Sequence, residues 1–442
     1  MNSPFVPHLV VNSSGQPDRR EESTLLFAGD FYLRAGHSLQ DHRDLFDPAI
    51  IGLVQQSTFS IVNFEGTIPT ADSQAIHKEG PHLAIDQRGP ALLKSLGFHG
   101  IALANNHAMD YGVEALRRTL QLCANCGLSH VGAAFNSVEA RQPLKVLLPG
   151  NVRVQVLSFC EREFGVSVGN RPGTACLTSP EAEDAVLQAK QEGDVVIVCT
   201  HGGNEFMPLP SPQRRQQLRH LIDAGADLII GHHPHVPQAW EQYLGRYIFY
   251  SLGDFYFDST DGRRYESRDW GFTVRVHLEG RRIKTLEIVP YERVQDKVVV
   301  LGSRQNAASR LSYLEQLSSI LAASEFEGYW QQLAVNRLSA YTSFLRGASA
   351  YSHLSFRGRL REILRMGREL GNLLRFTKPP HSLTDRSRQQ ALGLLNLIRC
   401  DSHRWAIETA LAVLTGECED LRSQKIKDAL DQNGSDLREG VL

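Results

Sequence analysis

The sequence lacks long apolar runs and has few cysteines for its length. None of its apolar runs approaches the roughly 20 residues that a helix needs to span a bilayer. The N-terminal residues carry proline and charge where a signal peptide would have an apolar core. The 7 cysteines are odd in number and scattered along the chain, which favours a reducing compartment over a disulfide framework. We therefore expect a cytoplasmic protein with no transmembrane segment.

An excess of charge of one sign is also absent. The chain has 47 lysines and arginines against 49 aspartates and glutamates, a formal net charge of -2. A nucleic-acid-binding domain usually carries a clear excess of basic residues, and disordered chains have fewer apolar residues than the 42% found here. These values indicate a globular protein with no nucleic-acid partner. Its 442 residues exceed one typical core, so we expect more than one structural unit.

Short apolar runs alternate with helical patterns over much of the chain. The runs predict buried strands at 24–29, 59–63, 100–104, 152–159, 194–199, 226–231 and 247–251. The helical patterns lie at 88–96, 111–126, 180–192 and 212–224. Two late strands, 271–278 and 282–290, are joined by Glu279 and Gly280 and predict a hairpin. Such alternation is typical of α/β folds, whose ligands gather at the carboxyl ends of the strands.

After residue 290 the sequence predicts helices only. We divide the chain into a disordered N-terminal arm (1–22), an α/β domain (23–295), an all-α C-terminal appendage (296–420) and a flexible tail (421–442). The stretch 357–378 is basic and amphipathic. It is either the solvated face of a packed helix or a surface for peripheral membrane contact or an acidic partner. The sequence does not indicate an oligomeric state.

Three histidines follow the apolar run 226–230, in the sequence Gly-His-His-Pro-His at 231–235. A His-x-His pair on an extended segment points both rings to the same side. Imidazole nitrogen is the commonest protein ligand for borderline metals. The pattern therefore favours a metal site at a strand end over ordinary hydrogen-bonded surface histidines.

Six loops that follow predicted strands carry Asp, Glu, Asn or His. The residues, in chain order, are Asp30, Glu65, Asn105, Asn106, His107, His201, Glu205, His232, His233, His235 and Asp254. Carboxylate, amide oxygen and imidazole together suit zinc, manganese or iron. Such an ion generates a nucleophile from water near neutral pH and polarises the bond under attack. The loops therefore predict a metal-assisted hydrolase.

At these residues the chain resembles the CapA proteins of poly-γ-glutamate capsule synthesis, within the calcineurin-like metallophosphatase superfamily. The resemblance runs from about residue 24 to about residue 290. Its markers are Phe-Ala-Gly-Asp at 27–30, Asn-Phe-Glu-Gly at 63–66, Ala-Asn-Asn-His at 104–107, Asp-Tyr-Gly at 110–112, His-Gly-Gly-Asn-Glu at 201–205, Gly-His-His-Pro-His at 231–235 and Tyr-Ser-Leu-Gly at 250–253.

The resemblance implies a four-layer α/β/β/α sandwich with a metal site at the strand ends. Asp30 would bind one ion, Glu65 would bridge or lie beside both, and a second ion would have further ligands from the later loops. The implied ligands are Asp30, Glu65, Asn106, His201, His233 and His235. His107 would be the general acid that protonates the leaving group.

The chain departs from the superfamily pattern at three points. Metallophosphatases usually open with Asp-x-His, but the third position here is Tyr32, so one ligand of the first ion is missing. Their second motif usually carries aspartate, whereas Glu65 stands here on a different spacing. An extra residue before the His-x-His pair makes His232 a rival ligand to His233. One ion and two ions of manganese, zinc or iron are both compatible with this pattern.

Four further residues are assigned to the site. Glu205 would bind metal, act as a base or hold a cationic substrate group, and its alternative is a surface salt bridge. Asp254 would add negative charge beside the metal, and its alternative is a capping residue of its own loop. Asn105 and Arg162 are expected to bind substrate, Arg162 through a bidentate contact with carboxylate or phosphate.

Two functions from different classes follow. The first is a metal-dependent hydrolase that acts on an amide bond (γ-glutamyl or peptide) or a phosphoester bond of a small or polymeric anionic substrate. The second is a non-catalytic assembly factor for poly-γ-glutamate or capsule polymer synthesis, in which the metal site is only structural. Complete ligands, a general acid and an open coordination position favour catalysis. We therefore expect the hydrolase.

Overall fold

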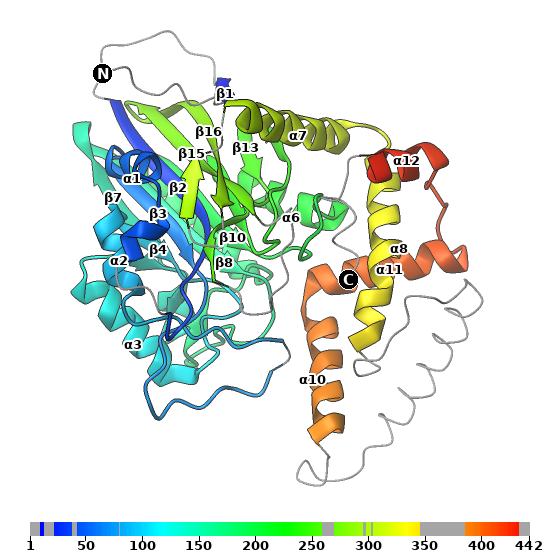
Figure 1. Ribbon diagram of the computed structural model, residues 1–442, viewed down its shortest axis with the longest axis horizontal. Coiled ribbons are helices and arrows are strands. Elements are labelled where there is room, and N and C mark those ends of the chain that lie inside the picture. Colours follow the sequence, from blue (N-terminus) through cyan, green and yellow to red (C-terminus); the bar gives the residue numbers. More distant parts are fainter. Residues whose placement is uncertain are drawn as a thin grey trace.

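Two β-sheets form the centre of the molecule, and helices cover their outer faces (Figure 1). The computed structural model describes residues 9–12, 22–37, 42–78, 80–258, 269–294, 298–301, 304–344 and 385–432. The first sheet has the order β1-β16-β15-β2-β3-β4-β5, with β14 beside β2 and β17 beside β16. The second has the order β12-β13-β11-β10-β8-β7, and β6 pairs with β9 in a small third sheet.

The strands of the first sheet are β1 (Leu9–Asn12), β2 (Glu22–Tyr32), β3 (Phe59–Phe64), β4 (Gly100–Ala102), β5 (Ser129–Val131), β14 (Asp254–Phe257), β15 (Trp270–Glu279), β16 (Arg282–Val294) and β17 (Val298–Leu301). Those of the second are β7 (Leu144–Leu148), β8 (Val152–Cys160), β10 (Val195–His201), β11 (Leu228–His232), β12 (Trp240–Tyr243) and β13 (Arg246–Phe249). The short pair is β6 (Ala133–Ala134) and β9 (Gly173–Thr174).

Apolar side chains between the two sheets form the inner core. Phe27 and Ile61 of the first sheet and Ile197 and Ile230 of the second belong to one buried cluster. Strands β2, β3 and β4 run parallel to one another, and so do β8, β10 and β11. Parallel strands that are covered on both faces need near-continuous apolar sequence, which is why these runs can be recognised in the sequence. Their carboxyl ends carry the polar loops.

Helices cover the outer face of each sheet. Those on the first sheet are α1 (Pro48–Gln55), α2 (Gly89–Leu96) and α3 (Gly112–Asn125), and those on the second are α5 (Pro180–Glu192) and α6 (Pro212–Asp223). The short helix α4 spans Ser137–Ala140. Helix α6 begins with Pro212 after Ser211, whose side chain accepts a hydrogen bond from the Arg214 amide. The α/β/β/α sandwich expected from the sequence is confirmed.

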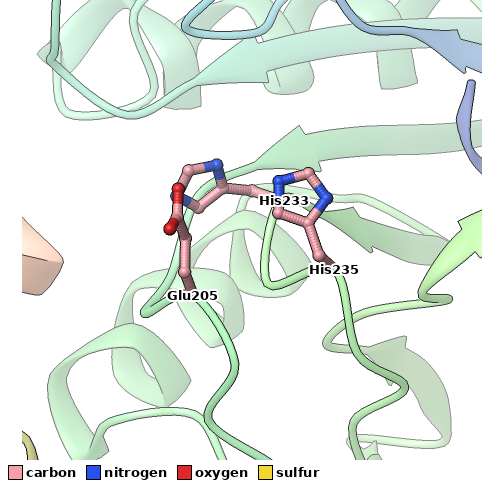
Figure 2. A group of neighbouring side chains, drawn as sticks. All are labelled: Glu205, His233 and His235. Atoms are coloured by element: carbon pink, nitrogen blue, oxygen red, sulfur yellow. The ribbon is translucent and has the colours of Figure 1, made fainter. Parts of the chain in front are cut away.

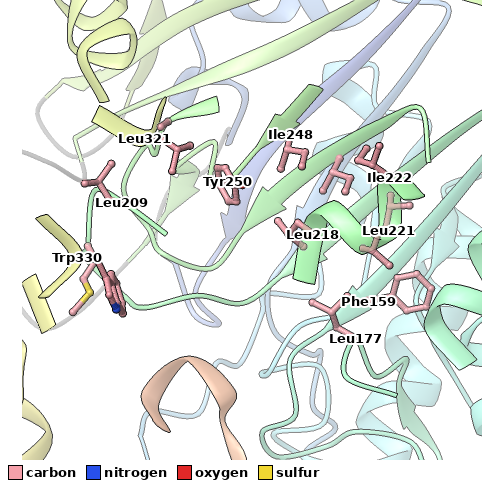
Figure 3. Close-up of a cluster of buried hydrophobic side chains, with 14 of the residues drawn as sticks. Phe159, Leu177, Leu209, Leu218, Leu221, Ile222, Ile248, Tyr250, Leu321 and Trp330 are labelled. Atoms are coloured by element: carbon pink, nitrogen blue, oxygen red, sulfur yellow. The ribbon is translucent and has the colours of Figure 1, made fainter. Parts of the chain in front are cut away.

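The helical region that follows β17 packs on the layer of α6. Its elements are α7 (Arg304–Ala322), α8 (Phe326–Phe344), α10 (Asp385–Arg399), α11 (Asp401–Thr415) and α12 (Gln424–Gln432). Leu321 of α7 and Trp330 of α8 lie in one buried cluster with Leu218 of α6 and Ile248 of β13 (Figure 3). The helical region and the second sheet therefore share a continuous core.

The structure corrects two expectations near the chain ends. Residues 9–12, expected in a disordered arm, form β1 and pair antiparallel with β16, because Leu9, Val10 and Val11 favour an extended edge strand. Residues 424–432, expected in a flexible tail, form α12, where Ile426 and Leu430 are buried. The basic stretch 357–378 lies outside the described residues. Among those that are described, no helix is long and apolar enough to cross a membrane.

Candidate metal centre

Polar side chains from both sheets meet at the carboxyl ends of the parallel strands. Asp30 lies near the end of β2, Glu65 directly follows β3, and His201 ends β10. His233 and His235 follow β11. The loop after β4 adds Asn106, whose Oδ1 lies 3.0 Å from Nε2 of His201. The structure therefore brings together the six residues that the resemblance implies as ligands.

The backbone of these loops adopts a conformation that side chains disfavour. His233 has a φ of 99° and His235 a φ of 59°, and nearby Phe206 has a φ of 60°. A positive φ in a residue other than glycine costs on the order of 1–3 kcal/mol and is found mostly at functional sites. This strain aims the two rings of the His-x-His pair into the cluster. The ring centroids of His201 and His233 are 4.7 Å apart.

Asp30, His235 and Asp254 form one group of possible ligands, with atoms within 4.8 Å of one another. Oδ1 of Asp30 accepts a hydrogen bond of 2.6 Å from Asn63 Nδ2, and its Oδ2 accepts one of 3.0 Å from the His233 amide. Asp254 stands directly beside Asp30 because β14 pairs with β2 in that register. Oδ1 of Asp254 lies 2.8 Å from Nδ1 of His235. This contact leaves Nε2 of His235 facing the cluster.

Asn106, His201 and His233 form a second group of possible ligands. Nε2 of His201 lies 3.0 Å from Asn106 Oδ1 and 3.1 Å from His233 Nδ1. Burial, together with the neighbouring imidazoles, holds the pKa of His201 well below its usual value. Burial also lowers the pKa of His233, to about 3. Both rings are therefore neutral at pH 7, which is the form that binds metal.

Glu65 lies between these two groups. Its side chain is fully buried, and neither carboxylate oxygen has a hydrogen-bond partner among the described residues. Oε1 lies 3.6 Å from His235 Nε2 and 3.8 Å from His107 Nε2. Burial raises the pKa of Glu65 well above its usual value. A buried carboxylate without a partner is costly, and a bound cation would supply the missing interaction.

Glu205 approaches the His-x-His pair from the loop after β10. Figure 2 shows its carboxylate next to the His233 ring. Glu205, His233 and His235 offer ligand atoms within 4.8 Å of one another. Burial alone raises the pKa of Glu205, but His233, His235, Arg337 and His403 together bring it down to about 2. Glu205 is therefore only partly exposed and faces the cluster.

His107 is oriented by a buried ion pair. Its Nδ1 lies 2.7 Å from Oδ2 of Asp110, and Nζ of Lys78 lies 2.6 Å from Oδ1 of the same carboxylate. This arrangement turns Nε2 of His107 toward Glu65 and the cluster. Burial and Lys78 lower the pKa of His107, and Asp110 opposes them. Lys78 is not identifiable from the sequence, because it lies in a polar loop without a recognisable motif.

Two residues that the sequence placed near the metal do not join the cluster. Nε2 of His232 lies 3.2 Å from the Ala28 carbonyl oxygen on the facing sheet, and the ring also hydrogen-bonds to the Thr200 backbone. His232 thus links the two sheets, whereas His233 lies in a group of possible ligands with Glu205 and His235. Tyr32 packs its ring on Phe257, with centroids 5.0 Å apart. Asp254, on the neighbouring strand β14, belongs to a group of possible ligands with Asp30 and His235.

The two residues expected to bind substrate lie differently. Asn105 is buried, its Nδ2 donates to the Phe64 carbonyl and its Oδ1 accepts from the His107 amide, so its side chain shapes the loop. Arg162 is exposed, whereas its neighbours Glu161 and Glu163 are buried. Oε1 of Glu163 lies 4.0 Å from His233 Nε2, and burial raises its pKa to about 7. Residues 162–165 form bends after β8, so no strand-like alternation in the sequence marks Glu163.

Comparison of the sequence with known protein families assigns the chain to one of them. A family profile described as bacterial capsule synthesis protein PGA_cap matches residues 24–259, more than half of the chain. The chain belongs to this family. The PGA_cap match contains every implied metal ligand and ends before α7, so the helical region lies outside it. The family resemblance given by the motifs is confirmed.

Curated relatives share the PGA_cap part of the chain. The PGA biosynthesis protein CapA of Bacillus subtilis is 32% identical over 243 residues, which cover 54% of this chain and 63% of that protein. The capsule biosynthesis protein CapA of Bacillus anthracis is 31% identical over 245 residues, covering 54% and 58%. The chain thus spans less than two thirds of the length of these relatives.

Similarity to solved structures is weaker. The 5′-nucleotidase from Candida albicans aligns with a TM-score of 0.37 and 12% sequence identity, covering 66% of this chain and 55% of that one. This similarity is too low to carry a functional argument.

Proposed function

We propose that this protein is a metal-dependent hydrolase that acts on an amide bond (γ-glutamyl or peptide) or a phosphoester bond of an anionic substrate. The observation that carries the proposal is the buried Glu65 carboxylate, which has no hydrogen-bond partner among the described residues. Nε2 of His233 is also buried without a hydrogen-bond partner among them. Both face neighbours that are themselves good metal ligands. A cytoplasmic location belongs to the same proposal.

The donor set fits a divalent ion of manganese, zinc or iron, since it mixes carboxylate and imidazole without thiolate. Asp30, Glu65 and His235 would hold one ion, while Asn106, His201 and His233 would hold another or complete the first set. When bound, the ion supplies a Lewis acid and lowers the pKa of a water molecule. Asp254 orients His235 through Nδ1, the usual role of a carboxylate behind a metal-binding histidine.

His107 would protonate the leaving group. Its Nδ1 is held by the Asp110 carboxylate, which stabilises the imidazolium form, and its Nε2 edge faces the cluster. Nζ of Lys78 lies 2.6 Å from Asp110 Oδ1 and 3.0 Å from His107 Nδ1, so it neutralises Asp110 and also opposes the positive charge of the imidazolium. The pair His107 and Asp110 thus forms a proton donor oriented next to the metal ligands, but not itself among them.

The second candidate function is a non-catalytic assembly factor for poly-γ-glutamate or capsule polymer synthesis. The relatives from the two Bacillus species are named biosynthesis proteins, which favours this alternative. In that case the cluster would hold a structural ion, and the orientation of His107 would have no chemical role.

Metal analysis of the purified protein tests the centre. We expect manganese, zinc or iron in the parent protein, and loss of the metal on replacement of Asp30, Asn106 or His235 by Ala. Asp86→Ala is a matched control, because Asp86 is also a buried aspartate but lies shortly before α2 and pairs with Arg88. Metal content equal to that of the parent in all three site variants would refute the site assignment.

His107→Ala separates the hydrolase from the assembly factor. We expect the variant to bind metal like the parent and to hydrolyse substrate at about 1% of the parental rate or less, since general acid catalysis contributes roughly 10²–10⁴-fold. Metal-loaded protein would be screened against aryl phosphates, phosphodiesters and γ-glutamyl amides. Equal rates in the two proteins would remove the general-acid role, and no turnover of any class would favour the assembly factor.

A further inference from the structure

The loop of residues 202–206, which we call the ligand loop, lies between the metal cluster and the helical region. It directly follows His201 and contains Glu205. Nδ2 of Asn204 lies 2.7 Å from the Tyr341 hydroxyl oxygen of α8 and 2.9 Å from the Ser402 carbonyl oxygen of α11. An amide nitrogen has two hydrogens to donate, and Asn204 donates both to the helical region.

Glu161 makes a second connection between the ligand loop and the helical region. Its Oε1 accepts a hydrogen bond of 2.7 Å from the Ser402 hydroxyl, and its Oε2 accepts one of 3.2 Å from the Gly203 amide. Arg214 of α6 forms an ion pair with Oε1 at 3.5 Å. The side chains of Glu161 and Arg214 are 0% and 2% exposed, so this ion pair depends on its additional hydrogen bonds.

The same ion pair contacts both sides of His201. Arg214 Nη2 donates to the hydroxyl of Thr200, the residue before His201, at 3.2 Å. On the other side, a Cβ added to Gly202 would lie 2.5 Å from Cγ of Glu161, so only glycine fits there. The chain is thus held on both sides of His201, a proposed metal ligand.

Side chains of the helical region also reach Glu205 electrostatically. The guanidinium of Arg337 on α8 lies 5.7 Å from the centre of the Phe206 ring, which stacks on His235 with centroids 6.1 Å apart. His403 of α11 packs against Tyr341, with ring centroids 5.2 Å apart. Arg337 and His403 both favour the charged form of Glu205. The helical region therefore lies close to the cluster as well as to the ligand loop.

We propose that Ser402 and Tyr341 are positioning residues of the metal centre, which act by holding the ligand loop so that Glu205 reaches the His-x-His pair. The helical region, which lies outside the PGA_cap match, then helps to hold the metal centre in place. This inference rests on the proposed metal centre. Residues that support metal ligands from behind typically change metal affinity or activity by about 10–100-fold when they are replaced.

The test measures binding of Mn²⁺ alone by isothermal titration calorimetry to metal-free full-length protein. Ser402→Ala and Tyr341→Phe are each expected to weaken binding by about 10-fold, and Ser402→Thr, which keeps the hydroxyl, is expected to restore it. The matched control is Thr409→Ala. It removes a hydrogen bond of 3.2 Å between Trp330 of α8 and Thr409 of α11, away from the ligand loop, and should leave the affinity unchanged.

A double-mutant cycle tests whether the effect passes through Glu205. In a Glu205→Gln background, Tyr341→Phe is expected to cause less than about a 2-fold further loss of Mn²⁺ affinity. If the losses of Mn²⁺ affinity in the two single variants simply add, the effect does not pass through Glu205. The proposal also fails if Tyr341→Phe and Ser402→Ala bind Mn²⁺ as tightly as the parent. It fails as well if Thr409→Ala loses as much affinity as they do. Tyr341→Phe keeps the ring, so it carries the test if Ser402→Ala does not fold. A parent protein that binds no divalent metal would instead refute the metal centre itself.

Discussion

Buried ionisable side chains at the cluster are held in particular protonation states by their neighbours. Burial raises the pKa of Glu163 to about 7 and lowers that of His403 to about 4. Glu205 is held near 2 in spite of burial, because cationic and imidazole groups surround it. Perturbed groups of this kind gather where metal or substrate binds. His403 is the one best suited to a measurement, since it lies outside the proposed ligand set.

His403 makes the metal-free protein sensitive to acid. Its pKa is about 4 in the folded protein against 6.5 in the unfolded chain, so the unfolded state binds more protons between these values. Its contribution to stability is therefore fully present above pH 6.5 and is lost as the pH falls toward 4. Between pH 7 and pH 5, the free energy of unfolding of the chelator-treated parent is expected to fall. In chelator-treated His403→Gln protein we expect this fall to be smaller than in the parent by about 1–2 kcal/mol.

Urea unfolding at the two pH values measures this difference. The control is His220→Gln, because the His220 side chain is 50% exposed, and this variant should show the same difference as the parent. If the free energy of unfolding of His403→Gln changed between the two pH values as much as that of the parent, His403 would not be held neutral by its surroundings.

At the scale of strands and helices, sequence patterns predicted the elements that are buried on two faces. Runs such as 194–199 and 226–231 correspond to β10 and β11, and the helix at 212–224 to α6. Elements with weaker patterns were missed, among them the short β14, which begins directly at Asp254. Its pairing with β2 is a long-range contact, so no local pattern reveals that Asp254 stands beside Asp30.

Gly29 of β2 lies directly against the backbone of Gly253, the residue before β14. A Cβ at Gly29 would lie 1.8 Å from the Gly253 carbonyl oxygen, and the Asp30 amide donates to that same oxygen at 3.0 Å. Because backbone cannot rotate out of the way, we expect Gly29→Ala to lower the free energy of unfolding by about 3 kcal/mol or more. It should also weaken metal binding, since it separates Asp254 from Asp30.

Gly52→Ala is the matched control for this variant. Gly52 lies inside α1, and a Cβ there would have only the Gln56 side-chain nitrogen at 4.0 Å. A helical glycine replaced by alanine gains roughly 0.5–1 kcal/mol, so this variant should be slightly more stable than the parent. Chemical unfolding of both proteins measures the contrast. Equal stability of Gly29→Ala and the parent would contradict the close approach of the two strands.

At the scale of the whole molecule, the sequence named side chains that the structure brings together, but not all of their surroundings. The six implied ligands could be named because each follows a strand in a recognisable motif. Lys78, Glu163, Tyr341 and Ser402 could not, because they reach the site through tertiary packing and carry no motif. The packing of α8 on α6 through Trp330 likewise depends on contacts between segments far apart in sequence.

Metal and fold should therefore be coupled across the whole chain. Without metal, the molecule contains the buried Glu65 carboxylate with no hydrogen-bond partner among the described residues, and metal binding would compensate it. An ion present at 100 times its dissociation constant stabilises the folded state by about 2.7 kcal/mol.

We expect Mn²⁺ to raise the unfolding temperature of chelator-treated protein by several degrees. We expect Glu65→Gln to show almost none of this increase, because it lacks the charge that the ion would neutralise. Thermal scans with and without Mn²⁺ measure both increases, with Asp86→Asn as the control that should respond like the parent. An increase in Glu65→Gln as large as that of the parent would mean that the ion binds elsewhere, and the proposed centre would fail with it.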